Sequence, residues 1–154
     1  LDLSIDEALD FFVDQPKVLA KLKPLQDVGL GYVKLGQSSS TLSGGEAQRI
    51  KLASFLIKGN NSKKTLFIFD EPTTGLHFHD IQKLLRSFSE LIALGNSILV
   101  IEHNMDMIKS ADWVIDIGPE GGERGGNIVF EGLPENLVKC KESFTGQYLK
   151  NHLQ

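Results

Sequence analysis

Two short apolar runs separated by an amphipathic segment constrain the fold of this chain more than any other feature. Residues 66–69 (Leu-Phe-Ile-Phe) and 98–101 (Ile-Leu-Val-Ile) are apolar at every position, which is typical of strands buried on both faces of a parallel sheet. Between them, apolar residues recur at helical spacing from about Asp80 until Gly95 ends the pattern. A strand, a helix and a second strand in this order predict an α/β fold with a mostly parallel sheet flanked by helices. Ligands of such folds bind at the carboxyl ends of the parallel strands.

The part of the chain before the first strand is predicted to be helical. Residues 2–12 form a short amphipathic helix with Ser4 as its N-cap. Pro16 is expected to open a second helix that is interrupted at Pro24. A long helix then spans about residues 44–58.

The part after residue 101 continues the alternation of strands and helices and ends in a glycine-rich hairpin. It is expected to contain a short helix (residues 105–110), a strand (113–117), a glycine-rich turn (118–126) and an antiparallel edge strand (128–130). Two closing helices are expected to begin near Pro134 and Phe144. Leu133, at the expected N-cap of the first closing helix, has no side-chain group that can cap it.

Composition bounds the class of protein. The chain has 154 residues, of which 41% are hydrophobic and 23% charged, and this balance is that of a soluble domain with a core of its own. No apolar run approaches the roughly 20 residues that cross a bilayer, so a cytoplasmic protein without a membrane partner is expected. The single cysteine, Cys140, excludes an internal disulfide and a sulfur-rich zinc site. Any metal must therefore be held by oxygen.

The net charge of −4 is unevenly distributed along the chain. Residues 1–64 carry nine Lys and Arg against seven Asp and Glu, whereas residues 65–154 carry seven against thirteen. Because DNA backbone binding is electrostatic, this balance gives no independent reason to expect tight DNA binding by the chain alone.

The sequence Leu-Ser-Gly-Gly-Glu at residues 42–46 opens the long helix. Ser43 and Glu46 have the spacing of a capping box, which is the simplest explanation for both. It does not explain Gly44 and Gly45, because a glycine in a helix costs about 1 kcal/mol relative to alanine. Backbone N–H groups without side chains at the positive end of a helix bind phosphate well, with the Ser43 hydroxyl as a further donor. The segment is therefore predicted to be an anion site.

Two carboxylates follow the first strand, and a histidine follows the second. Acidic residues often simply begin loops, but Asp70 and Glu71 stand where ligands of α/β sheets bind. Because neighbouring residues on a strand point to opposite sides, the two can divide two tasks. Asp70 is predicted to hold Mg²⁺, through water, and Glu71 to act as the general base. His103 is expected to contact a terminal phosphate or its attacking water.

These segments resemble the motifs of ATP-binding-cassette (ABC) ATPases. Residues 42–46 are similar to the signature motif, 66–71 to the Walker B strand with its catalytic glutamate, 74–77 to the D-loop, and His103 to the switch histidine. Longer strings narrow the resemblance to the UvrA family of excinuclease ATPases, which act in bacterial nucleotide excision repair (residues 27–32, 41–49, 70–77 and 116–122). The resemblance runs over essentially the whole chain.

The resemblance implies a partial P-loop NTPase fold and a set of site residues. Residues 1–41 would belong to the helical signature subdomain, and residues 42–154 would carry the signature helix, Walker B strand, D-loop and switch histidine. Glu71 and His103 would be the catalytic residues, and Asp70 would hold the metal ion. The residues that bind the nucleotide and its metal would be Ser43, Gly44, Gly45, Glu46, Gln48, Asp70 and Gly75. The signature residues would act across an interface on ATP held by a second nucleotide-binding domain of the same protein.

Two motifs of the family do not occur in the chain. There is no Gly-x-x-x-x-Gly-Lys-Ser/Thr phosphate loop and there are no CxxC pairs, so the family's zinc would be held elsewhere and the isolated chain is expected to be inactive. The resemblance implies a whole protein that uses ATP and Mg²⁺, forms a homodimer, binds damaged double-stranded DNA and works with the excinuclease protein UvrB. Two alternatives remain: the nucleotide-binding subunit of an ABC transporter, and a non-catalytic assembly module.

Overall fold

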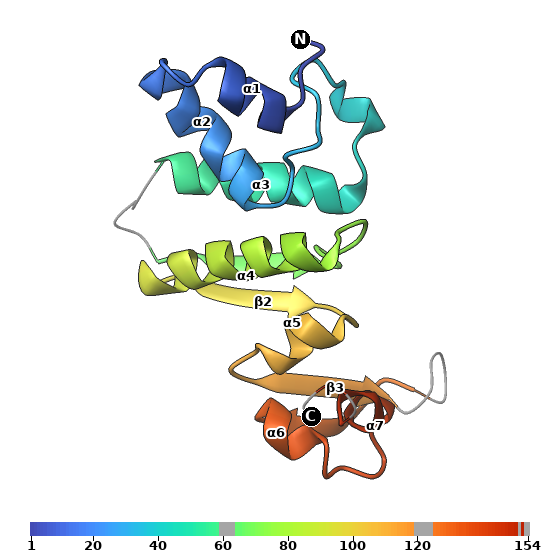
Figure 1. Cartoon of the computed structure of the whole chain (residues 1–154). Helices are drawn as coiled ribbons and strands as arrows, with labels where there is room; N and C mark the ends of the chain where they lie inside the picture. The colour runs from blue at the N-terminus through green and yellow to red at the C-terminus, as the bar shows by residue number, and fades with distance from the viewer. Residues whose placement is uncertain (59–63, 119–124, 151, 153–154) are drawn as a thin grey trace. The chain divides into compact units, whose positions relative to one another are not determined.

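The computed structural model describes residues 1–58, 64–118, 125–150 and 152 (Figure 1). The chain divides into two compact units, residues 1–101 and residues 102–154. The first unit holds the β-α-β segment and the second holds the hairpin.

The first unit begins with helices: α1 (Ile5–Phe11), α2 (Pro16–Asp27), a 3₁₀ turn η1 (Ser39–Thr41) and α3 (Gly44–Lys58). Ser4 caps α1 as predicted, and its side chain forms a capping box with Glu7. The predicted interruption at Pro24 is wrong, because α2 continues to Asp27. Pro24 removes one helical hydrogen bond near the end of α2, and the burial of Leu22 on the preceding turn favours the continuous helix.

The predicted β-α-β unit is confirmed. Its elements are β1 (Leu66–Asp70), α4 (Phe78–Ala93) and β2 (Ser97–Ile101). The two strands pair in parallel, with Leu66 opposite Ser97 and Asp70 opposite Ile101. Gly95 follows α4 with a φ of 86°, a left-handed conformation that suits glycine and ends the helix. The carboxyl ends of β1 and β2 therefore lie side by side.

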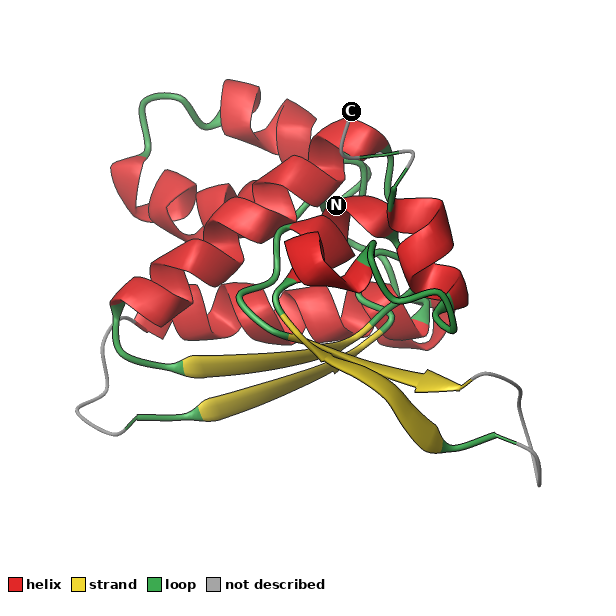
Figure 2. Cartoon of the chain, turned by 90° about the horizontal axis from the view of Figure 1, so that it is seen from below, coloured by secondary structure: helices red, strands yellow, loops and turns green. Residues whose placement is uncertain are grey.

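Helices cover one face of this sheet (Figure 2). On that face, Phe67 of β1 contacts Phe55 of α3, and Phe69 of β1 contacts Phe88 of α4, each pair with ring centroids 4.9 Å apart. The strands were expected to be buried on both faces, and in the described residues only one face is covered. The side chains of the other face are exposed because α3 and α4 both pack on the same side (Leu66, Ile68, Leu99 and Ile101).

The second unit contains α5 (Met105–Lys109), β3 (Val114–Gly118), β4 (Asn127–Gly132), α6 (Pro134–Leu137) and α7 (Phe144–Leu149). The antiparallel pairing of β3 with β4 is confirmed, with an irregularity between Asp116 and Ile117. The predicted glycine-rich turn falls largely on residues 119–124, which lie outside the described residues. Leu133 precedes α6 without a side-chain cap, as predicted. The predicted α/β class is confirmed, with a small parallel sheet in the first unit.

Candidate functional site

The start of α3 contains the predicted capping box. The Ser43 N–H donates to Glu46 Oε2 at 2.7 Å, and Ser43 Oγ accepts from the Glu46 N–H at 3.2 Å. The Ala47 N–H bonds the Ser43 carbonyl at 3.0 Å, so Gly44 and Gly45 hold the first two helical positions. Their N–H groups have no acceptor within the helix. The capping box thus leaves the anion-binding groups available, and the two interpretations of this motif are compatible.

The two glycines of the motif have different surroundings. A Cβ on Gly45 would lie 3.1 Å from Arg49 Nη1 and 3.5 Å from the carbonyl oxygens of Glu71 and Thr74. Packing inside the chain therefore accounts for Gly45. A Cβ on Gly44 would meet no atom within 4 Å, so Gly44 has no packing reason of this kind and leaves bare, exposed backbone that a phosphate oxygen can approach closely.

Glu46 has a second partner that the sequence did not indicate. The Tyr32 hydroxyl donates to Glu46 Oε1 at 2.6 Å. Together with the bonds from Ser43, this bond lowers the pKa of Glu46, so the carboxylate is ionised at neutral pH. Burial and the bond to Glu46 raise the pKa of the Tyr32 hydroxyl, which stays protonated as a donor.

Gln48 and Arg49 of α3 reach across to the end of β1. The Gln48 side chain pairs with the backbone of Asp70, since its Nε2 donates to the Asp70 carbonyl at 2.9 Å and its Oε1 accepts the Asp70 N–H at 3.1 Å. Arg49 is fully buried, and its Nη1 donates to the carbonyls of Pro72 at 2.7 Å and Thr74 at 3.3 Å. Sequence reasoning gave Arg49 no role. The one sequence feature that could have indicated its role is its position one helical turn after Gly45. Because Gly45 has no Cβ, the Arg49 side chain can lie close to its backbone.

The two carboxylates differ in backbone conformation. Asp70 is the last residue of β1 and is exposed. Glu71 leaves the strand with a φ of 47° and is the described non-glycine residue that has a positive φ. Its N–H still bonds the Ile101 carbonyl at 2.9 Å, and its own carbonyl accepts from the Thr74 N–H at 3.2 Å. The two side chains were expected to point to opposite sides because neighbouring strand residues alternate. The strand ends at Asp70, however, so the backbone conformation at Glu71 is that of the following turn.

The left-handed conformation of Glu71 is costly, at about 1–3 kcal/mol for a non-glycine residue. Such a conformation persists only where its surroundings fix it. The charge-assisted bond from Arg49 to Pro72 is worth about 1.5–3 kcal/mol by the usual range for such bonds. This bond fixes the backbone that immediately follows Glu71.

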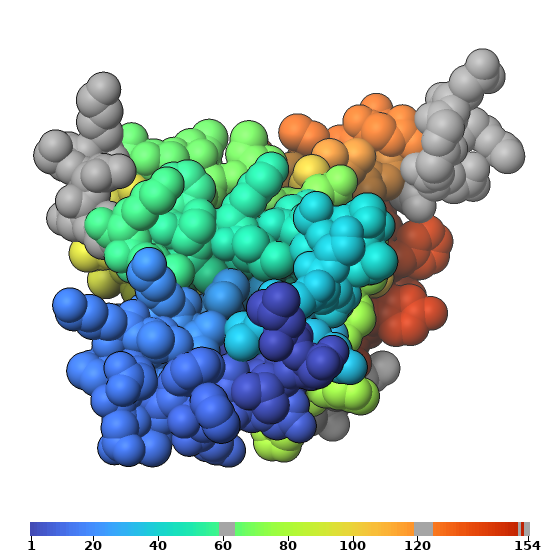
Figure 3. All heavy atoms as spheres, turned by 90° about the horizontal axis from the view of Figure 1, so that it is seen from above, coloured from blue at the N-terminus to red at the C-terminus, as the bar shows by residue number. Residues whose placement is uncertain are grey.

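The start of α3 and the D-loop share an open pocket of about 550 Å³. Of the predicted site residues, Ser43, Glu46 and Gly75 line it together, beside His77 of the D-loop. Gly75 has a φ of 78°, and a Cβ there would also meet no atom within 4 Å. Figure 3 shows the early part of α3 at the molecular surface, beside the residues that precede it in the chain.

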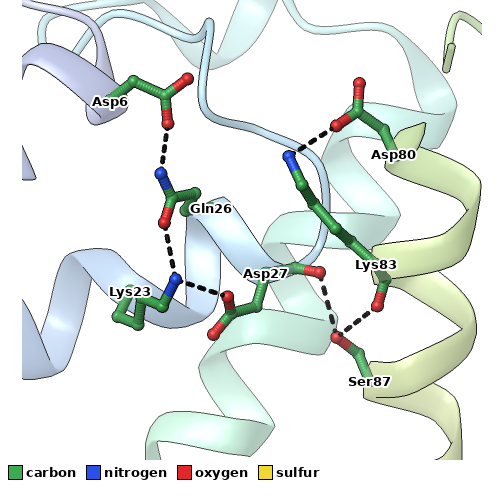
Figure 4. Close-up of polar contacts among 7 residues, drawn as sticks. All are labelled: Asp6, Lys23, Gln26, Asp27, Asp80, Lys83 and Ser87. Atoms are coloured by element: carbon green, nitrogen blue, oxygen red, sulfur yellow. Dashed lines mark hydrogen bonds and ion pairs between the residues drawn. The ribbon is translucent and has the colours of Figure 1, made fainter.

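A chain of polar contacts joins residues of α1, α2 and α4, three of which line this pocket (Figure 4). Asp6, at one end of the network, accepts from Gln26 Nε2 at 2.7 Å. Lys83 Nζ bonds Asp80 Oδ1 at 2.9 Å, and the Ser87 hydroxyl donates to the Asp27 carbonyl at 3.2 Å. Asp6 of α1 and Asp80 and Lys83 of α4 line the pocket, and Gln26 of α2 bonds Asp6.

His103 belongs to the second unit and is exposed. It follows the end of β2 by two residues, as the sequence predicted, and its N–H donates to Glu102 Oε2 at 3.0 Å. Asn104 caps α5 through the N–H groups of Asp106 and Met107. The Glu102 carboxylate thus holds the backbone at His103.

The residues present fit magnesium bound together with a nucleotide. Among residues 1–58, 64–118 and 125–150, no group of three or more His, Cys, Asp or Glu side chains could hold a metal ion by itself. Mg²⁺ usually takes one or two protein carboxylates and fills its remaining positions with water and substrate phosphates. A single exposed carboxylate such as Asp70 at a strand end matches that ligand set.

Comparison with known proteins gives the family of this site. No protein-family model matches the chain. UvrABC system protein A of Clostridium perfringens is 55% identical over 153 residues, which is 99% of this chain and 16% of the relative. The crystal structure of UvrA2 from Deinococcus radiodurans superposes with a TM-score of 0.83 and 44% identity, covering 100% of this chain and 19% of that one. Over its whole length the chain is similar to one segment of UvrA-type ABC ATPases. The predicted resemblance is therefore confirmed.

The UvrA-type segment also shares its fold with more distant proteins. A bacterial Atm1-family ABC exporter with ATP bound matches over the whole chain with a TM-score of 0.56 and 18% identity, which supports the fold alone. The chain spans about 16% of the length of the curated UvrA relatives that it matches. In the described part of the chain, no helix is long and apolar enough to cross a membrane.

Proposed function

We propose that this segment forms half of an ATP hydrolysis site in a UvrA-type, DNA-damage-recognition ATPase of bacterial nucleotide excision repair. The observation that carries the proposal is the 55% identity to UvrABC system protein A over 99% of the chain. The structure supports it by joining the signature helix α3 directly to the strand end that bears Asp70 and Glu71.

Two surfaces of the segment would meet nucleotide. The start of α3 offers the Ser43 hydroxyl and the N–H groups of Gly44 and Gly45 to the phosphates of an ATP held by a second nucleotide-binding domain. Glu46 holds Ser43 in place through the capping box, and Gly75 gives the D-loop an open backbone beside it. Gln48 acts through the backbone of Asp70.

The other surface would serve ATP bound to the segment's own domain. Mg²⁺, when bound, neutralises charge that develops on the phosphates. Asp70 is exposed at the end of β1 and would orient the ion through water. The Glu71 carboxylate would accept a proton from the attacking water. For His103, which belongs to the second unit, the family resemblance alone suggests a hydrogen bond to a terminal phosphate or an attacking water. Glu71 and His103 are both exposed to solvent in the segment, where substrate can reach them.

The whole protein is proposed to be a cytoplasmic homodimer that binds damaged double-stranded DNA and works with UvrB. ATP bound between two nucleotide-binding domains would hold them together. The acidic second half of the chain, with seven Lys and Arg against thirteen Asp and Glu, does not favour DNA contact through this part. Zinc, which the family is expected to bind, would be held by residues outside this segment.

The test is ATP hydrolysis by the complete protein with and without damaged duplex DNA. We expect DNA to change the rate and Glu71→Gln to lower it by roughly 10²–10⁴-fold, which is typical of losing a general base. Arg86→Lys, at an exposed position on α4, is the matched control. A rate that responds to a membrane partner and not to DNA would instead identify a transporter component. No hydrolysis in any form of the complete protein would identify an assembly module.

A further inference from the structure

Glu71, the proposed base, is bracketed by two side chains of α3. On its amino-terminal side, the Gln48 amide pairs with both the N–H and the carbonyl of Asp70, at 3.1 and 2.9 Å. On its carboxyl-terminal side, Arg49 Nη1 bonds the carbonyls of Pro72 and Thr74. The residue between these anchors has the left-handed φ of 47°.

Both anchors come from the helix that begins with the signature motif. Gln48 and Arg49 are the fifth and sixth residues of α3, one turn after Gly44 and Gly45. If α3 moves as a rigid helix, a shift of the end that is proposed to face phosphate also moves the Gln48 and Arg49 side chains. These side chains bond the backbone of Asp70 and Pro72. Both side chains bond the backbone of the turn that carries Glu71.

Arg49 has hydrogen-bonding capacity left over in this arrangement. Its Nε and Nη2 are buried and have no hydrogen-bond partner among the described residues. A buried guanidinium with unused donors is poorly satisfied, so the contacts that it makes with Pro72 and Thr74 are not the whole set it can make.

We propose that Gln48 and Arg49 are positioning residues that make the placement of the catalytic carboxylate of Glu71 depend on the placement of α3. The inference rests on the proposed function, and it adds regulation to it. The signature end of α3 serves the nucleotide of the facing domain, whereas Glu71 serves its own. The two anchors thus link nucleotide binding at one site to the geometry of the base at the other.

The experiment is a double-mutant cycle in the complete protein. Gln48→Met keeps side-chain length and removes both hydrogen bonds, and Gln15→Met, at an exposed position without a capping bond, is its control. Single-turnover hydrolysis and ATP affinity are measured for Gln48→Met, Glu71→Gln and the double variant, with the other nucleotide site disabled. The Mg²⁺ concentration that gives the half-maximal rate is measured for each.

A positioning residue acts only through the base. We expect Gln48→Met to slow hydrolysis at least about 10-fold while ATP affinity changes less than about 3-fold, and to slow the Glu71→Gln protein by less than about 2-fold. The Mg²⁺ midpoint should stay unchanged, which distinguishes an effect on Glu71 from one on Asp70. Arg49→Lys should show the same non-additivity, with Arg86→Lys as control.

Three results would overturn the inference. The first is hydrolysis by Gln48→Met at the level of its control. The second is equal slowing by Gln48→Met with and without the Glu71→Gln substitution, which would show independent action. The third is a changed Mg²⁺ midpoint with additive rates, which would assign Gln48 to the metal ligand. If Glu71→Gln alone leaves hydrolysis intact, the proposed function fails, and the inference fails with it for a separate reason.

Discussion

The Tyr32 hydroxyl lies 2.6 Å from Glu46 Oε1 and ties the segment before α3 to the first turn of that helix. Glu46 also closes the capping box with Ser43. One carboxylate thus joins the pocket wall at Tyr32 to the residue that is proposed to meet phosphate. The ionised form of Glu46 accepts both of these bonds, which lower its pKa.

The first prediction concerns Tyr32→Phe. The bond from Tyr32 is the largest cause of the lowered pKa of Glu46, so the variant should raise that pKa toward its ordinary value of 4.5. A lowered pKa contributes stability above 4.5 that is lost as pH falls through the folded value. We expect Tyr32→Phe to reduce the free energy of unfolding by about 1 kcal/mol at pH 7, and by less in acid. NMR titration of Glu46 and urea unfolding measure both quantities.

Tyr148→Phe is the control, because Tyr148 is 66% exposed. An unchanged titration midpoint for Glu46 in Tyr32→Phe would contradict this account of the pKa.

The second prediction separates Gly44 from Gly45. The Cβ added by Gly44→Ala would meet no atom within 4 Å. The variant should stabilise α3 by up to about 1 kcal/mol, since alanine is the better helix former. It should nevertheless impair ATP-dependent activity of the complete protein by blocking the approach of phosphate. Gly45→Ala should gain less stability or lose it, because its Cβ would crowd Arg49 at 3.1 Å. Urea unfolding measures the stability of each variant, and the hydrolysis rate of the complete protein measures its activity. A hydrolysis rate in Gly44→Ala equal to that of the unsubstituted protein would argue against an anion at this position.

The third prediction concerns the strain at Glu71. Asparagine tolerates the left-handed conformation better than other non-glycine residues, so Glu71→Asn should raise the free energy of unfolding by about 0.5–1 kcal/mol. Glu71→Gln keeps the strain and should change stability by less than about 0.5 kcal/mol. Both should lose hydrolysis in the complete protein. Urea unfolding of the two variants gives the comparison, and a less stable Asn variant would contradict it.

The periodicity of the sequence predicted most of the fold. The apolar runs at β1 and β2 and the helical spacing of α4 are local patterns, and each gave the right element within a few residues. Pro24 was misjudged because a local rule for proline was outweighed by packing of α2. The exposed face of β1 and β2 was also missed, since an apolar run does not tell which of its two faces is covered, and among the described residues helices cover one face only.

The candidate site was predictable in its residue types and not in its connections. Ser43, Glu46 and Gly75 were singled out by motif, and they line one pocket. The bonds from Gln48 to Asp70 and from Arg49 to Pro72 join residues 22 and 23 positions apart. No local pattern encodes such contacts. The left-handed turn at Glu71 was equally invisible, because nothing in Asp-Glu-Pro marks the glutamate for that conformation.

The fourth prediction is that the isolated chain hydrolyses ATP no faster than buffer. Phosphoryl transfer depends mainly on positioning and on charge stabilisation of the phosphates, and the chain has no phosphate-loop sequence. Release of inorganic phosphate by the purified chain, with Glu71→Gln as the control for contaminating enzymes, measures this. Steady turnover that disappears in Glu71→Gln would show that these residues hold ATP without the loop.

The fifth prediction is that Asp70→Asn and Glu71→Gln fail differently in the complete protein, although the residues are neighbours. Glu71→Gln keeps the shape of the side chain and removes its basicity, so ATP should still bind while single-turnover hydrolysis falls by roughly 10²–10⁴-fold. Asp70→Asn should weaken Mg²⁺ coordination, so that both hydrolysis and Mg²⁺-dependent retention of nucleotide decline. The backbone of Asp70 stays anchored by Gln48 in either variant, so the turn itself should survive.

Nucleotide affinity, the Mg²⁺ midpoint and single-turnover rates are compared with the other nucleotide site disabled, so that its activity does not mask the effect. Equal loss of ATP binding in both variants, or near-normal hydrolysis in Glu71→Gln, would reject this division of labour. The backbone argues for the division, because Asp70 ends a regular strand while Glu71 turns out of it with a φ of 47°. The two neighbouring carboxylates therefore stand on backbones of different conformation, as two separate roles would allow.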